Sequence, residues 1–261
     1  MAFDSERLLA WYEQVKRPLP WRATKNPYAL LVSEVMLQQT QARRVVPYYE
    51  AFLARFPDPE ALARAAPGDV LQAWSGLGYN RRALALQAAA RVVAERGWPE
   101  DLTELPGVGP YTAAAVGAFA WDRQEAAIDT NVRRVVERFD GAPRGPKALA
   151  ERVAALVPPG GAAAFNQAMM ELGATVCRPR APRCDACPVR RGCAGGPVSR
   201  PRSRGAVRFE DSDRYHRGRV VAALVAGEPP PDVPERILAG LERDGLIARD
   251  GDGCPRLPRA A

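Results

Sequence analysis

The segment that constrains the fold most reads Leu-Pro-Gly-Val-Gly-Pro-Tyr-Thr-Ala-Ala-Ala-Val and occupies residues 105–116. Its glycines tolerate the positive φ angles of a tight reversal, and Pro110 suits the first turn of a new helix. We therefore predict two helices joined by a hairpin, with the backbone N–H groups of Gly107, Val108 and Gly109 gathered at a helix N-terminus. Such donors can bind a backbone phosphate without contacting a base. An ordinary Gly-Pro turn between two core helices would produce the same pattern.

Length and charge admit a nucleic-acid partner without requiring one. The 261 residues suffice for two compact domains, or for one domain and a tail, and 47% of them are hydrophobic. A net charge of +7 favours a polyanionic partner, but many basic proteins bind no nucleic acid. The N-terminal residues lack a signal-peptide pattern, and the longest apolar run, near 113–121, is too short for a bilayer. We therefore expect a soluble cytoplasmic protein without a membrane partner.

Helical periodicity dominates the chain before residue 200, where strand signals are almost absent. This pattern predicts an all-α body, in which Asp4 or Ser5 caps the first helix and Pro18–Arg22 is extended. The second helix is expected from Asn26-Pro27 to about Gln41. Further helices are expected near 44–55, 59–65, 67–74 and 80–96. Another apolar helix is expected to end at Leu102 and Leu105, directly before the hairpin, and one more is expected to begin at about residue 126.

The composition changes after residue 196. Residues 197–212 predict a basic linker, and two helices (213–226 and 234–244) with a hairpin (246–257) predict a small α/β, winged-helix-like module at 213–261. We expect this basic tail to contact the phosphates of a polyanionic partner, which adds affinity without choosing a base. The side chains expected to contact phosphates there are Arg200, Arg202, Arg204 and Arg208.

Glu34 is a carboxylate within an apolar part of the second predicted helix. Leu30 and Leu31 lie one turn before it, and Leu37 lies one turn after it. Burial among leucines would raise the pKa of this carboxyl and favour its protonated form, as a general acid requires. Periodicity alone leaves open a solvent-facing glutamate at the edge of the apolar stripe.

Tyr79 and Asp129 also have both a structural and a functional interpretation. The glycine-rich segment 74–82 presents Tyr79 beside arginines, which suits insertion between bases but also a buried tyrosine that packs the loop. Asp129 precedes a helical pattern, so that its residue type and position alone favour an N-cap.

Four cysteines lie close together at Cys177, Cys184, Cys187 and Cys193. In a cytosolic protein such a group suits a metal site better than disulfides. The spacing alone leaves zinc and an iron–sulfur cluster open, since each accepts four cysteines. Five arginines surround the loop and are expected to contact phosphates: Arg178, Arg180, Arg183, Arg190 and Arg191.

The segment Ser33-Glu-Val-Met-Leu-Gln-Gln-Thr40 resembles the signature of the MutY-type adenine DNA glycosylases, a family of the helix-hairpin-helix (HhH-GPD) superfamily. The resemblance extends over residues 5–196 and implies the two-lobed fold of these enzymes. One lobe, a six-helix barrel with the hairpin, would comprise 27–121, and an iron–sulfur lobe would comprise 1–26 and 122–196. Because relatives carry a [4Fe-4S] cluster on cysteines of this 6-2-5 spacing, the resemblance implies that cofactor here. Typical members end in a much larger domain than the present tail.

The resemblance implies catalytic roles for three residues. Glu34 would protonate the leaving adenine, Asp129 would face the sugar with its negative charge, and Asn131 would support the same site. Tyr111 stands where bifunctional, endonuclease III-type relatives carry a Schiff-base lysine. Because the chain has no lysine between Lys25 and Lys147, a monofunctional hydrolase follows.

Further residues correspond to positions that bind the substrate in the family. Gln39 would wedge into the duplex and Tyr79 would intercalate beside the opposing guanine. Most relatives carry a second tyrosine at the next position, where this chain has Asn80. The contact that position 80 makes is therefore left open. The base pocket would be lined by Trp21, Arg22 and Gln167.

The implied function is base excision repair on double-stranded DNA by a monomeric, nucleoid-associated enzyme of bacterial type. It would hydrolyse the N-glycosidic bond of adenine mispaired with 8-oxoguanine or guanine. One alternative is a thymine or uracil mismatch glycosylase of the same superfamily, against which Glu34 and Gln167 argue. Another is a non-catalytic iron–sulfur DNA-binding protein, which would need neither Glu34 nor Asp129. A helical domain with structural zinc would leave the hairpin and both carboxylates unexplained.

Overall fold

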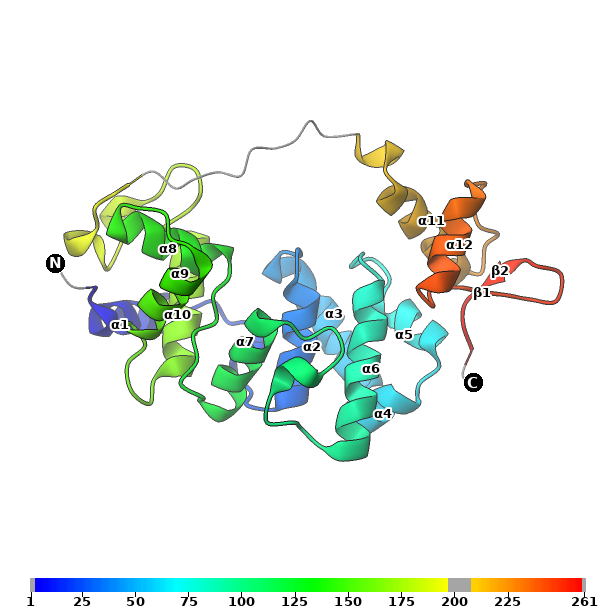
Figure 1. Cartoon of the computed structure of the whole chain (residues 1–261), viewed down its shortest axis with the longest axis horizontal. Helices are drawn as coiled ribbons and strands as arrows, with labels where there is room; N and C mark the ends of the chain where they lie inside the picture. Colours follow the sequence, from blue (N-terminus) through cyan, green and yellow to red (C-terminus); the bar gives the residue numbers. More distant parts are fainter. Residues whose placement is uncertain (1–2, 197–207, 260–261) are drawn as a thin grey trace. The chain divides into compact units, whose positions relative to one another are not determined.

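The structure, a computed structural model, describes residues 3–196 and 208–259, and these are mostly helical (Figure 1). Within the described residues, the sheet consists of two short antiparallel strands, β1 (Ala248–Arg249) and β2 (Pro255–Arg256). The predicted all-α class of the body is confirmed. Two compact units can be distinguished, one drawn from residues 1–31 and 109–202 and one from 32–108 and 203–261. The predicted lobes, 27–121 and 1–26 with 122–196, have other bounds than these units. They stay a prediction, because compactness alone does not define a domain.

Helix α10 (Ala162–Thr175) is central to the first unit, where it packs against three other helices (Figure 1). Large apolar side chains such as Leu8, Phe165 and Met169 are fully buried in this core. The helices of this unit, besides the first part of α2 (Pro27–Leu37), are α1 (Ser5–Val15), α7 (Pro110–Trp121), α8 (Thr130–Asp140), α9 (Pro146–Ala154) and α10.

A close approach of α8 and α10 depends on Gly173. A β-carbon at this position would lie 2.5 Å from Cβ of Asn131, which is too close for two carbon atoms. Glycine therefore allows the start of α8 to lie against the backbone of α10. The predicted cap of the first helix is also confirmed, since Asp4 Oδ1 accepts a hydrogen bond from the Arg7 N–H at 2.9 Å.

The body of the second unit is built around α6 (Arg81–Arg96), which packs against α4 (Pro59–Arg64) and α5 (Pro67–Trp74). The rings of Phe52, on α3 (Ala42–Arg55), and Trp74 meet edge to face in its core, with centroids 6.0 Å apart. The amide of Gln87 is buried and donates to the backbone carbonyls of Leu62 and Ala65. These bonds give carbonyls at the end of α4 an acceptor role beyond the helix itself.

The C-terminal module consists of α11 (Asp213–Ala226), α12 (Glu235–Arg243) and the β1–β2 hairpin, as predicted. Ala248 pairs with Arg256 in the hairpin. The module belongs to the second unit: α11 contacts α5, and the Gly68 N–H donates to the Pro258 carbonyl at 2.9 Å. Most of the predicted basic linker, at 197–207 and including Arg200, Arg202 and Arg204, lies outside the described residues.

Three local predictions are wrong. The segment predicted as extended forms a 3-10 helix at Pro20–Arg22, and the second helix ends at Leu37 rather than near Gln41. The helix predicted at 80–96 is confirmed and ends at Arg96, where Gly97 adopts φ 77° at the C-cap. The separate apolar helix expected to end at Leu102 and Leu105 is not an α-helix. A short 3-10 helix at Leu102–Glu104 then leads into the hairpin.

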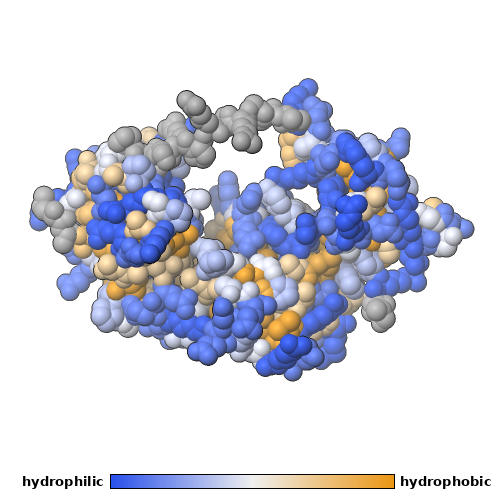
Figure 2. Space-filling model, viewed as in Figure 1, coloured by the Kyte–Doolittle hydropathy of each residue, from blue (hydrophilic) through white to orange (hydrophobic). Residues whose placement is uncertain are grey.

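The surface visible in Figure 2 is mostly hydrophilic, with apolar residues scattered across it. In the parts of the chain that the structure describes, no helix has both the length and the apolar character needed to cross a membrane.

Candidate active site

Helix α2 buries the carboxyl group of Glu34. Asn26 Oδ1 caps the helix by accepting hydrogen bonds from the N–H groups of Tyr28 and Ala29, and Pro27 occupies its first turn. Glu34 is only 4% exposed, and Leu30 on the same helix is buried as well. The solvent-facing alternative for Glu34 is therefore wrong. Such surroundings are typical of carboxylic acids that act as proton donors.

Gln39 and Tyr79 meet although they lie forty residues apart. The Tyr79 hydroxyl donates a hydrogen bond to Oε1 of Gln39, and we call these two residues the Gln39–Tyr79 pair. Both have positive φ angles, 58° for Gln39 and 50° for Tyr79, which non-glycine residues rarely adopt. Gln39 is exposed and Tyr79 is half-buried, so that neither side chain is part of the core. A surface pair held in this uncommon conformation indicates a functional constraint on both turns.

Arg82 holds the two turns of this pair together. Its guanidinium donates to the carbonyls of Val35 and Gln38 at 2.7 Å each, and to the carbonyl of Gly78 at 3.0 Å. These bonds satisfy carbonyls at the end of α2 and explain why the helix stops there. Burial lowers the pKa of Arg82 to about 10, which still leaves it protonated near neutral pH. No sequence pattern indicates this role of Arg82, because its contacts join residues far apart in the chain.

The hairpin has the backbone geometry that its sequence predicts. Gly107 adopts φ 76°, and a β-carbon there would lie 2.7 Å from Cβ of Ala85, so that only glycine fits. The Val108 N–H donates to the Leu105 carbonyl at 3.0 Å, which closes the turn. Gly109 is the N-cap of α7, whose first residue is Pro110. The N-terminal end of α7 is thus formed directly by the glycine-rich turn.

Asp129 is the N-cap of α8. Its Oδ1 accepts hydrogen bonds from the N–H groups of Asn131 at 2.8 Å and Val132 at 2.7 Å. Its Oδ2 accepts a third, from Nδ2 of Asn131, at 2.6 Å. The structural interpretation as a cap is therefore confirmed, and the side chain of Asn131 orients the same carboxylate. A half-buried anion at a helix N-terminus also lies where the helix dipole stabilises negative charge.

Arg134 connects this capped carboxylate to the cysteine loop. Its guanidinium donates to Oδ1 of Asn131 and to the Gly173 carbonyl, each at 2.7 Å, and to the Cys177 carbonyl at 2.8 Å. The residue is buried, and burial lowers the pKa of its guanidinium, although nearby Cys177 and Asp129 oppose that shift. One side chain therefore fixes Asn131 against α10 and against the first cysteine.

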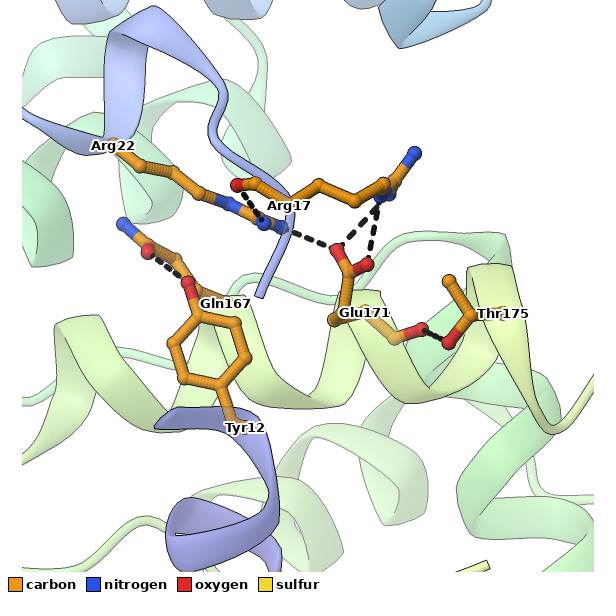
Figure 3. Close-up of polar contacts among 6 residues, drawn as sticks. All are labelled: Tyr12, Arg17, Arg22, Gln167, Glu171 and Thr175. Atoms are coloured by element: carbon orange, nitrogen blue, oxygen red, sulfur yellow. Dashed lines mark hydrogen bonds and ion pairs between the residues drawn. The ribbon is translucent and has the colours of Figure 1, made fainter. Parts of the chain in front are cut away.

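Gln167 and Arg22, two predicted pocket residues, each bond to a partner near α10 (Figure 3). The Arg22 guanidinium lies 5.4 Å from the centroid of the Tyr12 ring, which links the two sets of contacts into one network. The Tyr12 hydroxyl donates to Oε1 of Gln167 at 2.6 Å. Glu171 has no exposed surface, and its carboxylate accepts from Arg22 at 2.6 Å and from Arg17 at 2.7 Å. Burial would raise the pKa of Glu171, but the hydrogen bonds from the two arginines outweigh it and lower that pKa.

This network fixes the orientation of residues that the sequence identified and contains others that it missed. Trp21 is buried and lies next to Arg22 in the 3-10 helix Pro20–Arg22. Tyr12, Arg17 and Glu171 were missed, because no motif marks them. A single carboxylate in the apolar run Ala168–Gly173 was the one available signal.

Tyr111 is the second residue of α7 and packs at the edge of the small cluster of apolar side chains that includes Leu30 and Ala115. It is half-buried. The chain has no lysine from residue 26 to residue 146, so that the first turn of α7 carries no amine nucleophile.

The four cysteines of residues 177–193 differ in burial, and an arginine lies against the first of them. Cys177 is buried, Cys187 and Cys193 are half-buried against the core of the first unit, and Cys184 is exposed. Arg138 Nη1 lies 3.0 Å from Sγ of Cys177. Burial raises the pKa of the Cys177 thiol, and Arg138 opposes this shift by favouring the thiolate. Burial also raises the pKa of the Cys187 thiol, and the neighbouring cysteines add to this shift.

The four cysteine side chains do not form a preassembled metal-binding site in the described part of the chain. In residues 3–196 and 208–259, no three or more histidine, cysteine, aspartate or glutamate side chains form a preassembled metal-binding group. The chemistry of the donors nevertheless fits a thiolate-bound group, because all four are cysteines and Arg138 lies against the first of them.

Comparison with known proteins places the chain in a family. The sequence profile of the HhH-GPD superfamily of base excision DNA repair proteins matches residues 32–159. The adenine DNA glycosylase of Mycobacterium tuberculosis (strain H37Rv) is 42% identical, over 96% of this chain and 92% of that protein. This chain belongs to the adenine DNA glycosylase family. The adenine DNA glycosylase of Mycolicibacterium smegmatis is 40% identical, over 97% of this chain and 95% of that protein.

Similarity within the adenine DNA glycosylase family extends into the C-terminal module. The expectation that the resemblance ends at residue 196 is wrong, since matches to 96% and 97% of the chain cannot be reached without residues beyond it. The mouse adenine DNA glycosylase is 44% identical over 74% of this chain, which corresponds to 41% of that longer protein. The tail of this family member is therefore of a kind shared with the mycobacterial relatives.

Solved structures agree with the fold expected of an adenine DNA glycosylase. The structure of a thermostable thymine-DNA glycosylase superimposes with a TM-score of 0.68 at 31% identity, covering 73% of this chain and 93% of that one. A trapped covalent intermediate of endonuclease III with DNA gives a TM-score of 0.64 at 21% identity, covering 74% and 93%. The expected helix-hairpin-helix glycosylase fold is confirmed.

Proposed function

We propose that this family member releases adenine mispaired with 8-oxoguanine or guanine from double-stranded DNA, in base excision repair. It acts as a monomer and hydrolyses the N-glycosidic bond. The observation that carries the proposal is the burial of Glu34 within the Ser33–Thr40 segment of a chain whose relatives are adenine DNA glycosylases. A buried carboxyl at that position supplies the proton donor that release of a purine needs.

The proposed reaction uses two carboxyl groups in different roles. Adenine leaves the base stack first, because its glycosidic bond cannot be reached inside a duplex. Glu34 transfers a proton to N7 of adenine, so that the base departs as a neutral molecule. Asp129, which Asn131 orients, stabilises the positive charge that develops on the sugar, and water completes the hydrolysis. The division of roles parallels that of glycoside hydrolases.

DNA binding is proposed for three groups of residues. The backbone at Gly107, Val108 and Gly109 binds a phosphate at the start of α7, and the arginines of the cysteine loop add further phosphate contacts. The Gln39–Tyr79 pair inserts into the duplex at the mismatch. Adenine is held in a pocket lined by Trp21, Arg22 and Gln167.

The reaction is tested by single-turnover base release from duplexes that carry A:8-oxoG, A:G, A:C, T:G and U:G. Rapid release of adenine opposite 8-oxoguanine and guanine, without release of thymine or uracil, is the expected result. The structural likeness to a thymine-DNA glycosylase is the specific reason for including T:G. Faster release of thymine than of adenine would replace the proposed function by that alternative.

Strand cleavage is expected to require added alkali, because Tyr111 cannot form the Schiff base that a lyase step needs. Base release should leave intact strands with abasic sites, and borohydride should trap little covalent complex. The two activities can be compared on the same labelled duplex, with and without alkali. Borohydride trapping at the rate of base release would contradict the monofunctional assignment.

We further propose that Cys177, Cys184, Cys187 and Cys193 hold a [4Fe-4S] cluster. When bound, the cluster supplies a cross-link that ties loop 177–193 together and a one-electron redox centre. This chain's own contribution at Cys177 is Arg138, whose guanidinium lies 3.0 Å from Sγ and favours the thiolate.

Iron and sulfide analysis of anaerobically purified protein tests this assignment. About four iron and four sulfide ions per chain are expected from the cluster formula. Cys187→Ser should lose most of the iron, whereas Cys254→Ser, at an exposed cysteine of the C-terminal module, should retain it. Stoichiometric zinc in the wild-type protein would contradict the assignment.

A further inference from the structure

The C-terminal module brings an arginine onto the ring of Tyr79. The guanidinium carbon of Arg214, on α11, lies 4.0 Å from the centroid of the Tyr79 ring. Arg82 lies over the same ring at 5.4 Å. A guanidinium this close to an aromatic ring is attracted by the negative electrostatic potential of the ring face. Tyr79 is therefore held by Arg214 and Arg82 at its ring and by Gln39 at its hydroxyl.

Contacts within the module place Arg214 in this position. Ser212 caps α11 by accepting a hydrogen bond from the Tyr215 N–H, and the rings of Phe209 and Tyr215 meet edge to face with centroids 5.5 Å apart. Phe209 also lies 5.3 Å from the Arg214 guanidinium, although it is 51% exposed itself. The start of α11 is thus ordered by its own local packing.

The module is attached to the body of the second unit at two other points. The Gly68 N–H donates to the Pro258 carbonyl, and Asp244 lies 3.6 Å from Arg81 at the start of α6. Asp244 also pairs with Arg217 of α11, which links that helix to the same attachment. The contacts with Gly68 and Arg81 therefore hold the module, and with it Arg214 of α11, against the body of the second unit.

We propose that Arg214 is a positioning residue for Tyr79, through which the C-terminal module takes part in mismatch recognition. The inference rests on the proposed function, in which Tyr79 inserts into the duplex. A cation on the ring face restricts the side-chain torsions of Tyr79, so that less rotamer freedom is lost when the ring enters DNA. This role differs from the sequence-independent phosphate contacts expected of the tail, because it favours mismatched over paired DNA.

An arginine on an exposed surface can also contact a phosphate, and the two roles predict different results. Loss of a phosphate contact weakens binding to every duplex by a similar factor, whatever residue occupies position 79. Loss of a positioning contact weakens binding only where Tyr79 inserts. It also has no further effect once Tyr79 has been removed.

The test compares binding to an A:G mismatch with binding to the same duplex carrying A:T. In both duplexes the target adenosine is 2′-fluorinated, which slows cleavage by destabilising positive charge on the sugar. Arg214→Ala should reduce the preference for the mismatch about two- to fivefold, as expected for loss of an exposed cation–π contact. Tyr79→Ala should reduce it at least as much, and the double variant should equal Tyr79→Ala.

Arg219→Ala serves as the matched control. Arg219 is an exposed arginine of the same helix and lies over Tyr215 rather than Tyr79, at 5.8 Å from the ring centroid. This variant should keep the wild-type preference while losing the same charge.

The outcomes separate this inference from the proposed function. Equal losses on both duplexes, an additive double variant, or an unchanged preference in Arg214→Ala would each overturn the positioning role while leaving the proposed function intact. A wild-type protein without any preference for the mismatch would refute both.

Discussion

Replacement of Glu34 by glutamine is expected to slow adenine release by about 10²- to 10⁴-fold in single-turnover measurements. Glutamine has nearly the same size and can remain in the buried position on α2, but an amide cannot donate a proton to N7 of adenine. Binding of mismatched DNA should change little, because binding requires the shape of the side chain rather than its acidity. The rate and the affinity should be measured on the same A:8-oxoG duplex.

Glu137→Gln is a suitable control for the loss of a buried carboxyl group. Glu137 is 3% exposed on α8, where it pairs with Arg133 at 3.3 Å, and no role in the chemistry is proposed for it. This variant should retain the rate of base release if it folds, which thermal unfolding can confirm. A Glu34→Gln protein that releases adenine at the wild-type rate would show that Glu34 is not the acid.

Asp129→Asn is expected to reduce adenine release by a similar factor, about 10²- to 10⁴-fold. Asparagine caps helices as well as aspartate does, so that the bonds from the Asn131 and Val132 N–H groups can be retained. The amide lacks the negative charge that would stabilise the developing sugar cation. The bond from Asn131 Nδ2 to Oδ2 is lost in this variant, so that the melting temperature should fall slightly while the rate falls far more.

Comparison with Asp129→Ala separates the two roles of this residue. Alanine removes both the cap and the charge, and loss of the cap alone should destabilise the protein by about 1 kcal/mol. If Asp129 were only a cap, Asp129→Asn would be fully active and Asp129→Ala would be impaired in proportion to its lost stability.

The sequence predicts the elements of this fold where local chemistry decides the structure. Gly107 must adopt a positive φ, Asp129 precedes a helical pattern and can bond to free N–H groups, and α11 has the predicted bounds. In each case the relevant partners lie within a few residues of one another. Errors occurred where the choice was between an α-helix and a 3-10 turn, as at Leu102–Glu104, since periodicity hardly separates such short segments.

The sequence does not predict the contacts that hold candidate site residues in place. Arg82, Arg134 and Glu171 each bind groups that lie tens of residues away, so that their role depends on the folded chain. Their residue types are ordinary for surface positions, which is why no pattern marked them. The meeting of Arg214 with Tyr79 is of the same kind, because it depends on how α11 packs within the second unit.

The hydrogen bonds of Arg134 connect the Asp129 carboxylate to the cysteine loop through Asn131. Its guanidinium spans the Cys177 carbonyl and the side chain of Asn131, and Asn131 in turn orients the carboxylate. If loop 177–193 loosened, Arg134 would lose one of its acceptors, and Asn131 would lose part of its support. If Asp129 stabilises the sugar cation as proposed, a chain with an incomplete loop would bind DNA and still hydrolyse the glycosidic bond slowly. Under that proposal, the Arg134 contacts would make the rate of the reaction depend on the order of loop 177–193.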